Sequence, residues 1–173
     1  DTQILPEAGT TNAVRLITRV AMPPLLYQTW DGTNRDLLGE SEKPTLVILW
    51  ASWCMPCLEE LKELTQAQEK LRQAGVNIIA ISVDGVGDDK TDSENSQRVL
   101  KSLKFPFASG RATEDLLFGL QKMHDRQAAI RRPLPLPTSL LLNANDELMV
   151  FYKGPLQIPE LLSDLAHVED TAT

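Results

Sequence analysis

Two spacings of apolar residues recur along the chain. Residues 44–50 are a continuous, partly β-branched apolar run of the length of a buried strand. Leucines then recur at helical spacing, at Leu58, Leu61, Leu64 and Leu71, and Gly75 ends that pattern. Residues 76–83 form a second apolar strand. This strand, helix, strand series predicts two parallel strands joined by a right-handed crossover.

The rest of the chain continues in the same way. After residue 83 the pattern predicts a polar loop at 84–95, a helix near 96–103, an extended piece from Phe105, a helix reaching Ile130, a hairpin of 140–143 with 147–152, and a closing helix at 158–167. Near the start, residues 25–30 and 33–38 flank Asp31-Gly32, which supplies the positive φ angles of a tight hairpin turn. Residues 14–20 are either an edge strand or a tether.

Length and composition suit a single α/β domain. The chain has 173 residues, 42% of them hydrophobic, which is enough to bury a substantial core without crosslinks. We expect a domain over residues 21–168, an N-terminal extension or tether at 1–20 and a flexible tail at 169–173.

The charge excludes some classes of partner. A net charge of −7 argues against nucleic acid and against anionic membranes, since both require clustered Lys and Arg. No apolar run approaches the roughly 18 residues of a membrane span. The chain opens at Asp1 without a charged and then apolar leader, so we expect that an export signal or anchor has been removed or never existed.

Candidate chemistry centres on the only two cysteines, Cys54 and Cys57, at the predicted junction of a strand and a helix. Pro56 suits the first helical turn, which places Cys54 at the helix start and Cys57 one turn further in, on the same face. The two sulfurs can then form a disulfide, and the N–H groups of the helix N-terminus favour a thiolate on Cys54. This arrangement suits reversible redox chemistry.

Two other uses of the cysteine pair are a structural crosslink and half of a zinc site. A disulfide across so short a loop removes little entropy from the unfolded chain. A zinc site needs two more ligands, and the two histidines, His124 and His167, have no paired spacing. We therefore expect no metal site. In the loop at 84–95, the acidic residues do not match the spacing of a calcium loop, and we interpret them as solvated.

Two segments carry a resemblance to a known family. Residues 49–60, which contain the sequence Trp-Cys-Met-Pro-Cys, resemble the active-site segment of thioredoxin-fold proteins, and more closely that of the TlpA/ResA-like thiol-disulfide oxidoreductases of bacterial cell envelopes. Residues 134–143 resemble that family's Pro-Leu-Pro-Thr-Thr-Phe-Leu-Ile-Asn segment. The resemblance runs from about Ala21 to Ala166. It implies a thioredoxin-like α/β fold, with a central mixed β-sheet flanked by helices, an N-terminal hairpin and a cis-proline, to which this chain adds a helical insertion before that proline.

The resemblance also implies roles for individual residues. Cys54 attacks the disulfide of a partner and Cys57 resolves the mixed disulfide. Glu60 matches a buried acidic residue of the family that accepts and returns the protons of the thiols. Ile48 stands where ordinary thioredoxins carry a buried Asp as proton acceptor, which leaves Glu60 as the only nearby candidate for that role. Pro137 would be cis and face the disulfide. The expected substrate-binding residues are Trp53, Met55, Pro56, Leu136, Pro137 and Thr138, with Trp50 packed around the dithiol.

Residues 113–132 depart from the family pattern, because relatives reach the cis-proline sooner. Arg126, Arg131 and Arg132 are either a positive rim beside the active site or cations placed against a helix end. His124, in the same helix, is interpreted as a surface histidine rather than a proton-transfer group.

Three functions follow from these observations. The first is an envelope thiol-disulfide oxidoreductase, periplasmic or otherwise outside the cytoplasm and possibly tethered to a membrane in a longer chain. It would reduce partner disulfides, such as those of apocytochrome c, would take electrons from an upstream donor, and would need no cofactor beyond its own disulfide. We expect a monomer. The alternatives are a docking module of a larger chain and a thiol peroxidase, although Ser52 lies only two residues before Cys54 and does not form the Thr-x-x-Cys setting of a peroxidatic cysteine.

Overall fold

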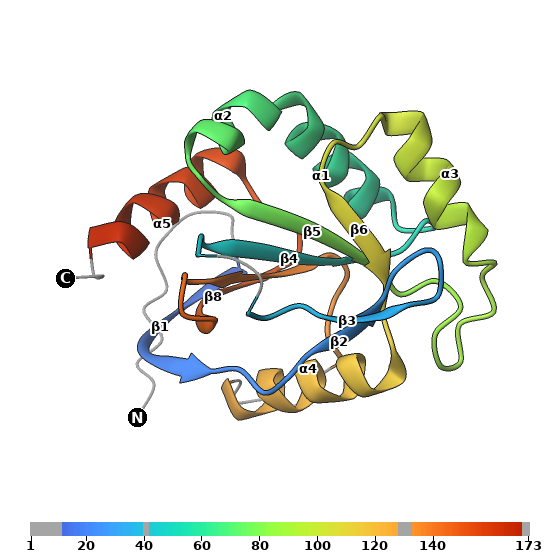
Figure 1. Ribbon diagram of the computed structural model, residues 1–173, viewed down its shortest axis with the longest axis horizontal. Helices are drawn as coiled ribbons and strands as arrows, with labels where there is room; N and C mark the ends of the chain where they lie inside the picture. Colours follow the sequence, from blue (N-terminus) through green and yellow to red (C-terminus); the bar gives the residue numbers. More distant parts are fainter. Residues whose placement is uncertain (1–11, 40–41, 128–132, 171–173) are drawn as a thin grey trace.

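A computed structural model describes residues 12–39, 42–127 and 133–170, and it is built on an eight-stranded mixed sheet (Figure 1). The strand order is β1-β8-β7-β4-β5-β6-β2-β3. At its centre β4 (Thr45–Trp50) pairs in parallel with β5 (Asn77–Ser82), which pairs in parallel with β6 (Ala108–Arg111). The predicted parallel pair is therefore confirmed.

Antiparallel strands complete the sheet on both sides. On one side are β7 (Thr138–Leu142), β8 (Glu147–Lys153) and, at the edge, β1 (Asn12–Ala21). On the other side is the hairpin of β2 (Leu26–Gln28) and β3 (Asn34–Asp36), which is shorter than its predicted strands. Gly32, with φ of 90°, lies in its turn as the sequence predicts. Of the two alternatives for residues 14–20, the structure has the edge strand.

Helices cover the two faces of the sheet unequally (Figure 1). One face carries α1 (Met55–Gln66), α2 (Gln68–Gln73), α3 (Glu94–Leu103) and α5 (Ile158–Asp170), and the other carries α4 (Glu114–Gln127). None of the helices in the described segments is long and apolar enough to cross a bilayer.

The continuous apolar runs of the sequence are explained by these two layers, because successive side chains of β4 point to opposite faces. Leu46, Ile48 and Trp50 pack in a core with Leu61, Leu64 and Leu161, on the side of α1 and α5. Val47 and Leu49 pack in a second core with Leu116 and Leu120 of α4. Each face of the central strands is thus buried under helices, and the carboxyl end of β4 is left to carry the cysteines.

Two predictions about helices are wrong. The sequence predicts one helix from residue 58 through Leu71, but the helix breaks at Ala67, which caps α1 and precedes α2. His124 is buried rather than at the surface, and its ring lies 5.8 Å from that of Phe151, measured between centroids. The buried and exposed faces of a helix lie half a turn apart, so a small error in assigning the buried face places a buried residue such as His124 at the surface. The predicted extension to Ile130, with Arg131 and Arg132, lies outside the described residues.

Candidate active site at the start of helix α1

The two cysteines meet at the N-terminus of α1. Cys54 is the N-cap residue, with extended φ and ψ of −93° and 103°, and its Sγ accepts a hydrogen bond of 3.3 Å from the backbone N–H of Cys57. Pro56 occupies the first turn, where its missing N–H is not needed. Cys54 and Cys57 form a disulfide, with their Cα atoms 5.2 Å apart. The predicted placement at the helix start is confirmed.

Both cysteines are buried in the oxidised protein, and Cys54 is the less covered of the two, with an exposed fraction of 6% against 1% for Cys57. Trp53 and Met55, on either side of Cys54, are 59% and 65% exposed. Large apolar side chains that remain in solvent beside a reactive group mark a contact surface for another molecule.

The segment before β7 lies against this site. The Leu136-Pro137 peptide bond is cis, as the resemblance predicts. Pro137 and Thr138 are buried, the Pro137 carbonyl accepts a hydrogen bond from the Gly154 N–H at 2.8 Å, and the Thr138 hydroxyl donates to the Pro135 carbonyl at 2.6 Å. Both groups are thus engaged within the chain. Leu136 is partly buried and contributes to both hydrophobic cores, so its exposed part is what this segment offers to a substrate.

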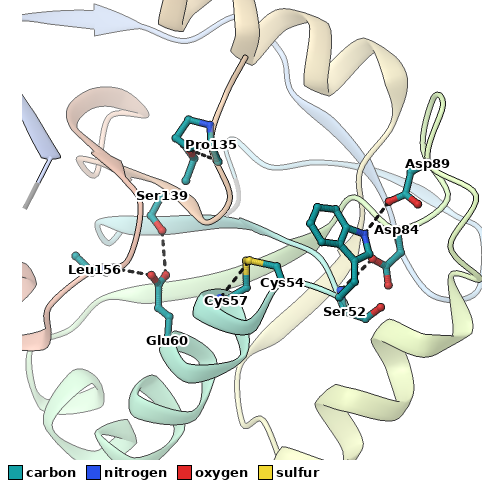
Figure 2. Close-up of a disulfide and its surroundings, with 11 residues drawn as sticks. Ser52, Cys54, Cys57, Glu60, Asp84, Asp89, Pro135, Ser139 and Leu156 are labelled. Carbon is teal, nitrogen blue, oxygen red and sulfur yellow. Dashed lines mark hydrogen bonds between the residues drawn. A yellow bond between two sulfur atoms is a disulfide. The ribbon is translucent and has the colours of Figure 1, made fainter. Parts of the chain in front are cut away.

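Glu60 lies behind the dithiol and is buried (Figure 2). Its Oε2 accepts a hydrogen bond from the Leu156 N–H at 2.8 Å, and its Oε1 accepts one from the Ser139 hydroxyl at 3.3 Å. Burial raises the pKa of Glu60 to about 7, although the two hydrogen bonds oppose that rise. A carboxyl group with such a pKa can both release and take up a proton near neutral pH.

A second buried carboxylate belongs to Asp84, which the sequence analysis placed in a solvated acidic loop. That interpretation is wrong for Asp84, which is 1% exposed. Its Oδ1 accepts a hydrogen bond from the Ser52 N–H at 3.0 Å, and its Oδ2 accepts one from the Ser96 hydroxyl at 2.6 Å. Figure 2 shows Glu60 and Asp84 on opposite sides of the disulfide. Glu60 is therefore not the only buried carboxylate beside the active-site segment.

A local signal for Asp84 is present in the sequence. The Val83 N–H donates to the Trp50 carbonyl at 2.8 Å, which extends the pairing of β4 and β5 by one residue. Asp84 therefore follows directly on a buried strand, at the same edge of the sheet as the cysteines. Carboxylates in that position face the active sites of parallel sheets, whereas those further along the loop are solvated.

The two tryptophans beside the dithiol have different surroundings. Trp50 is fully buried and packs in the same core as both cysteines, as expected. The Trp53 indole N–H donates to the Asp89 carboxylate at 3.1 Å, which ties the exposed ring to the loop after β5. Across the described segments, His, Cys, Asp and Glu form no group of three that could hold a metal ion.

Comparison with known proteins places these features in a family. The AhpC/TSA family model matches residues 20–151. A thiol-disulfide oxidoreductase ResA of Bacillus thuringiensis subsp. konkukian is 26% identical over 134 residues, which is 76% of this chain and 67% of the relative. The sporulation thiol-disulfide oxidoreductase A of Bacillus subtilis is 22% identical over 79% of this chain and 74% of its own length.

Solved structures share the fold. A secreted thiol-disulfide isomerase from Corynebacterium glutamicum superposes with a TM-score of 0.73 at 16% identity, covering 98% of each chain. At that identity the likeness establishes the fold, which is the thioredoxin-like α/β fold that the sequence predicts.

Proposed function

The chain belongs to the AhpC/TSA family, and on that premise we propose that this thiol-disulfide oxidoreductase reduces the disulfides of partner proteins outside the cytoplasm. The observation that carries the proposal is the geometry of the cysteine pair. The sulfur of Cys54 caps the N-terminus of α1, and the more deeply buried sulfur of Cys57 lies one turn further in and forms a disulfide with it.

The reaction proceeds in two exchanges. In the reduced protein the Cys54 thiolate attacks one sulfur of the partner disulfide, and the other partner sulfur leaves as a thiolate. The Cys57 thiolate then attacks Sγ of Cys54 and releases the second partner sulfur. Two electrons pass to the partner, and the protein is left with the Cys54-Cys57 disulfide seen in the structure. An upstream dithiol donor must reduce it again.

Residues around the dithiol serve separate steps. The N–H groups at the start of α1 stabilise the attacking thiolate of Cys54. Cys57 is buried and reacts only after losing its proton, and Glu60, whose pKa is near 7, is the group we assign to accept it. Trp53, Met55 and the exposed part of Leu136 contact the partner chain, with Pro56, Pro137 and Thr138 shaping the surface beneath it.

The location rests on relatives. The Corynebacterium glutamicum protein is described as secreted, which supports a site of action beyond the cytoplasm. We propose partners with exposed disulfides, because the matched relatives are named thiol-disulfide oxidoreductases, and apocytochrome c is the candidate partner that the family resemblance of the cysteine segment implies. A monomer, joined to a membrane only through segments beyond this fold, would suffice for such chemistry.

Reduction of insulin by dithiothreitol is the direct test. We expect the wild-type protein to accelerate insulin precipitation and Cys54→Ser to abolish the effect, because the attacking thiolate is lost. Cys57→Ser should instead accumulate a mixed disulfide with insulin, visible on a non-reducing gel. If neither the wild type nor Cys54→Ser accelerates insulin reduction, only the docking module remains. If the protein consumes hydrogen peroxide faster than it reduces insulin, a peroxidase is favoured.

A further inference from the structure

A cleft of about 290 Å³ lies beside the dithiol, on the side of α4. Trp53 and Leu136 form one end of it, and these two residues also flank the reactive disulfide and the cis-proline. Its other apolar lining residues include Val86, Leu117 and Leu134, and its polar lining residues are Asp89 and Gln121. The cleft is therefore continuous with the surface that a partner disulfide must approach.

One wall of the cleft combines the stretch that sets this chain apart from the family pattern with the segment that resembles it. Leu117 belongs to α4, and Leu134 lies in the segment that joins α4 to β7. The Leu134 N–H donates to the Gln121 side-chain oxygen at 2.9 Å, so the two parts of the wall are fixed to each other. Both leucines also pack against the core under α4, which makes the wall rigid.

The size and the lining of the cleft indicate its occupant. Small-molecule pockets measure roughly 300 to 1,000 Å³, so this cleft is at the lower limit and suits one side chain better than a cofactor. Five of the residues named above as lining the cleft have apolar side chains. Desolvation raises the pKa of Asp89, but the hydrogen bonds that it accepts from Thr91 and Trp53 together lower that pKa, so the carboxylate stays charged and repels an acidic group.

We propose that this cleft is a specificity subsite that receives an aliphatic or aromatic side chain of the partner polypeptide, close in sequence to the cysteine attacked by Cys54. The proposal rests on the proposed function, because the partner segment is placed by its disulfide. Burial of the side chain between Trp53 and Leu117 stabilises the encounter before sulfur exchange. An acidic residue in the same position would lie against Asp89 and be disfavoured.

Peptides that carry one cysteine as a mixed disulfide with 5-thio-2-nitrobenzoate provide the test. The Cys54 thiolate of the reduced protein attacks the peptide sulfur and expels nitrothiobenzoate, whose absorbance gives the rate, and Cys57 then releases the peptide thiol. The peptides differ only in one residue, Leu, Ala or Asp, placed two positions before the cysteine in one series and two positions after it in another. We expect the Leu peptide to react about fivefold faster than the Ala peptide in one series, and Asp to be slowest.

Variants decide whether the cleft causes that preference. Leu117→Asn keeps the branched shape of the side chain but makes the wall polar, and the ratio of Leu to Ala rates should fall close to one. Val86→Asn, on a loop rather than on α4, should lower the same ratio even if the helix variant folds poorly. Phe118→Asn is the matched control, because Phe118 is exposed next to Leu117 and lies outside the cleft. The ratio of Leu-peptide to Ala-peptide rates for Phe118→Asn should equal that of the wild type.

Two outcomes would overturn the proposal. One is equal rates for all peptides in the wild-type protein, and the other is a Leu preference that survives both cleft variants. Neither outcome affects the proposed function, since the peptides would still be reduced. A protein that reduces none of these peptides and no insulin would instead overturn the function itself.

Discussion

At the scale of single residues, the dithiol lies between two buried carboxyl groups that differ in what holds them. Glu60 accepts hydrogen bonds from a backbone N–H of the segment before α5 and from the Ser139 hydroxyl of β7. Asp84 accepts hydrogen bonds from the backbone of the active-site segment itself and from the Ser96 hydroxyl of α3. The first lies behind the dithiol, where we propose that it exchanges protons with Cys57, and the second holds the segment that precedes Cys54.

For Glu60 we predict an effect on stability that depends on pH. Its pKa is raised from 4.5 to about 7, so the folded state binds the proton more tightly than the unfolded state. The stabilising contribution is complete below pH 4.5 and is lost as the pH rises through 7. Glu60→Gln, which cannot ionise, should therefore gain up to about 3 kcal/mol in unfolding free energy relative to wild type between pH 4 and pH 8.

Urea unfolding of the oxidised proteins at several pH values measures this difference. Glu59→Gln is the matched control, because Glu59 precedes Glu60 and is exposed. The Glu60 variant should also resolve mixed disulfides more slowly, with a changed pH profile. A constant difference in stability across the range would show that the carboxyl group does not titrate as the structure implies.

For Asp84 we predict a loss of stability and of activity together. Asp84→Ala leaves the partly buried N–H of Ser52 and the buried Ser96 hydroxyl without their acceptor, which costs about 2 kcal/mol of unfolding free energy. The freed segment holds Cys54 less firmly at the helix start, so insulin reduction should slow. Asp84→Asn keeps one acceptor oxygen, so its stability and its rate of insulin reduction should lie between those of the wild type and of Asp84→Ala. Asp88→Ala, an exposed neighbour in the same loop, should match the wild type, and an equal loss in that variant would contradict the assignment.

At the scale of secondary structure elements, α1 makes the two cysteines unequal. The Cys57 N–H in its first turn donates a hydrogen bond to Sγ of Cys54, whereas the sulfur of Cys57 lies within the helix and is more deeply buried. We predict that iodoacetamide at neutral pH labels Cys54 of the reduced protein at least ten times faster than Cys57. Mass mapping after brief labelling gives the ratio, and equal or reversed labelling would contradict the assigned roles.

A second element-scale prediction concerns the edge strand β1. Arg15 of β1 donates hydrogen bonds to Asp164 at 2.8 Å and to Glu160 at 2.7 Å, both on α5, and Tyr152 of β8 also donates to Asp164. Arg15→Ala leaves the largely buried Asp164 with a lost partner, and we expect it to cost about 2 kcal/mol of unfolding free energy. Arg19→Ala removes a longer contact, 3.9 Å to Glu147, and should cost less than half as much in the same urea titration.

The sequence predicts the elements near the site better than it predicts their surroundings. The strand β4, the capped helix start and the position of Cys54 follow from local spacing, because an apolar run and a proline in the first turn act over few residues. The burial of Asp84 and His124 depends on contacts with elements far along the chain. The cleft beside Trp53 likewise needs Leu117 and Leu134 from across the sheet, which no local pattern specifies.

At the scale of the whole molecule, we expect the charges around the dithiol to influence the direction of electron flow. The reduced dithiol carries a thiolate, whereas the disulfide is uncharged. Two buried carboxyl groups flank the dithiol, Asp89 lies beside Trp53, and the chain carries a net charge of −7. All of these disfavour a nearby negative charge, while the α1 N-terminus favours it. If the carboxylates prevail over the helix, the disulfide is the preferred state and the dithiol is a reductant.

We therefore predict a reduction potential more negative than the roughly −220 to −260 mV of glutathione measured by extraction. Equilibration with reduced and oxidised glutathione, followed by alkylation and mass spectrometry, gives the value. Glu60→Gln should make the potential less negative, because it removes a charge that opposes the thiolate, and Glu59→Gln should leave it unchanged. A wild-type potential near the −120 mV of strong oxidants would mean that the helix N-terminus dominates, and the protein would then form disulfides in its partners rather than reduce them.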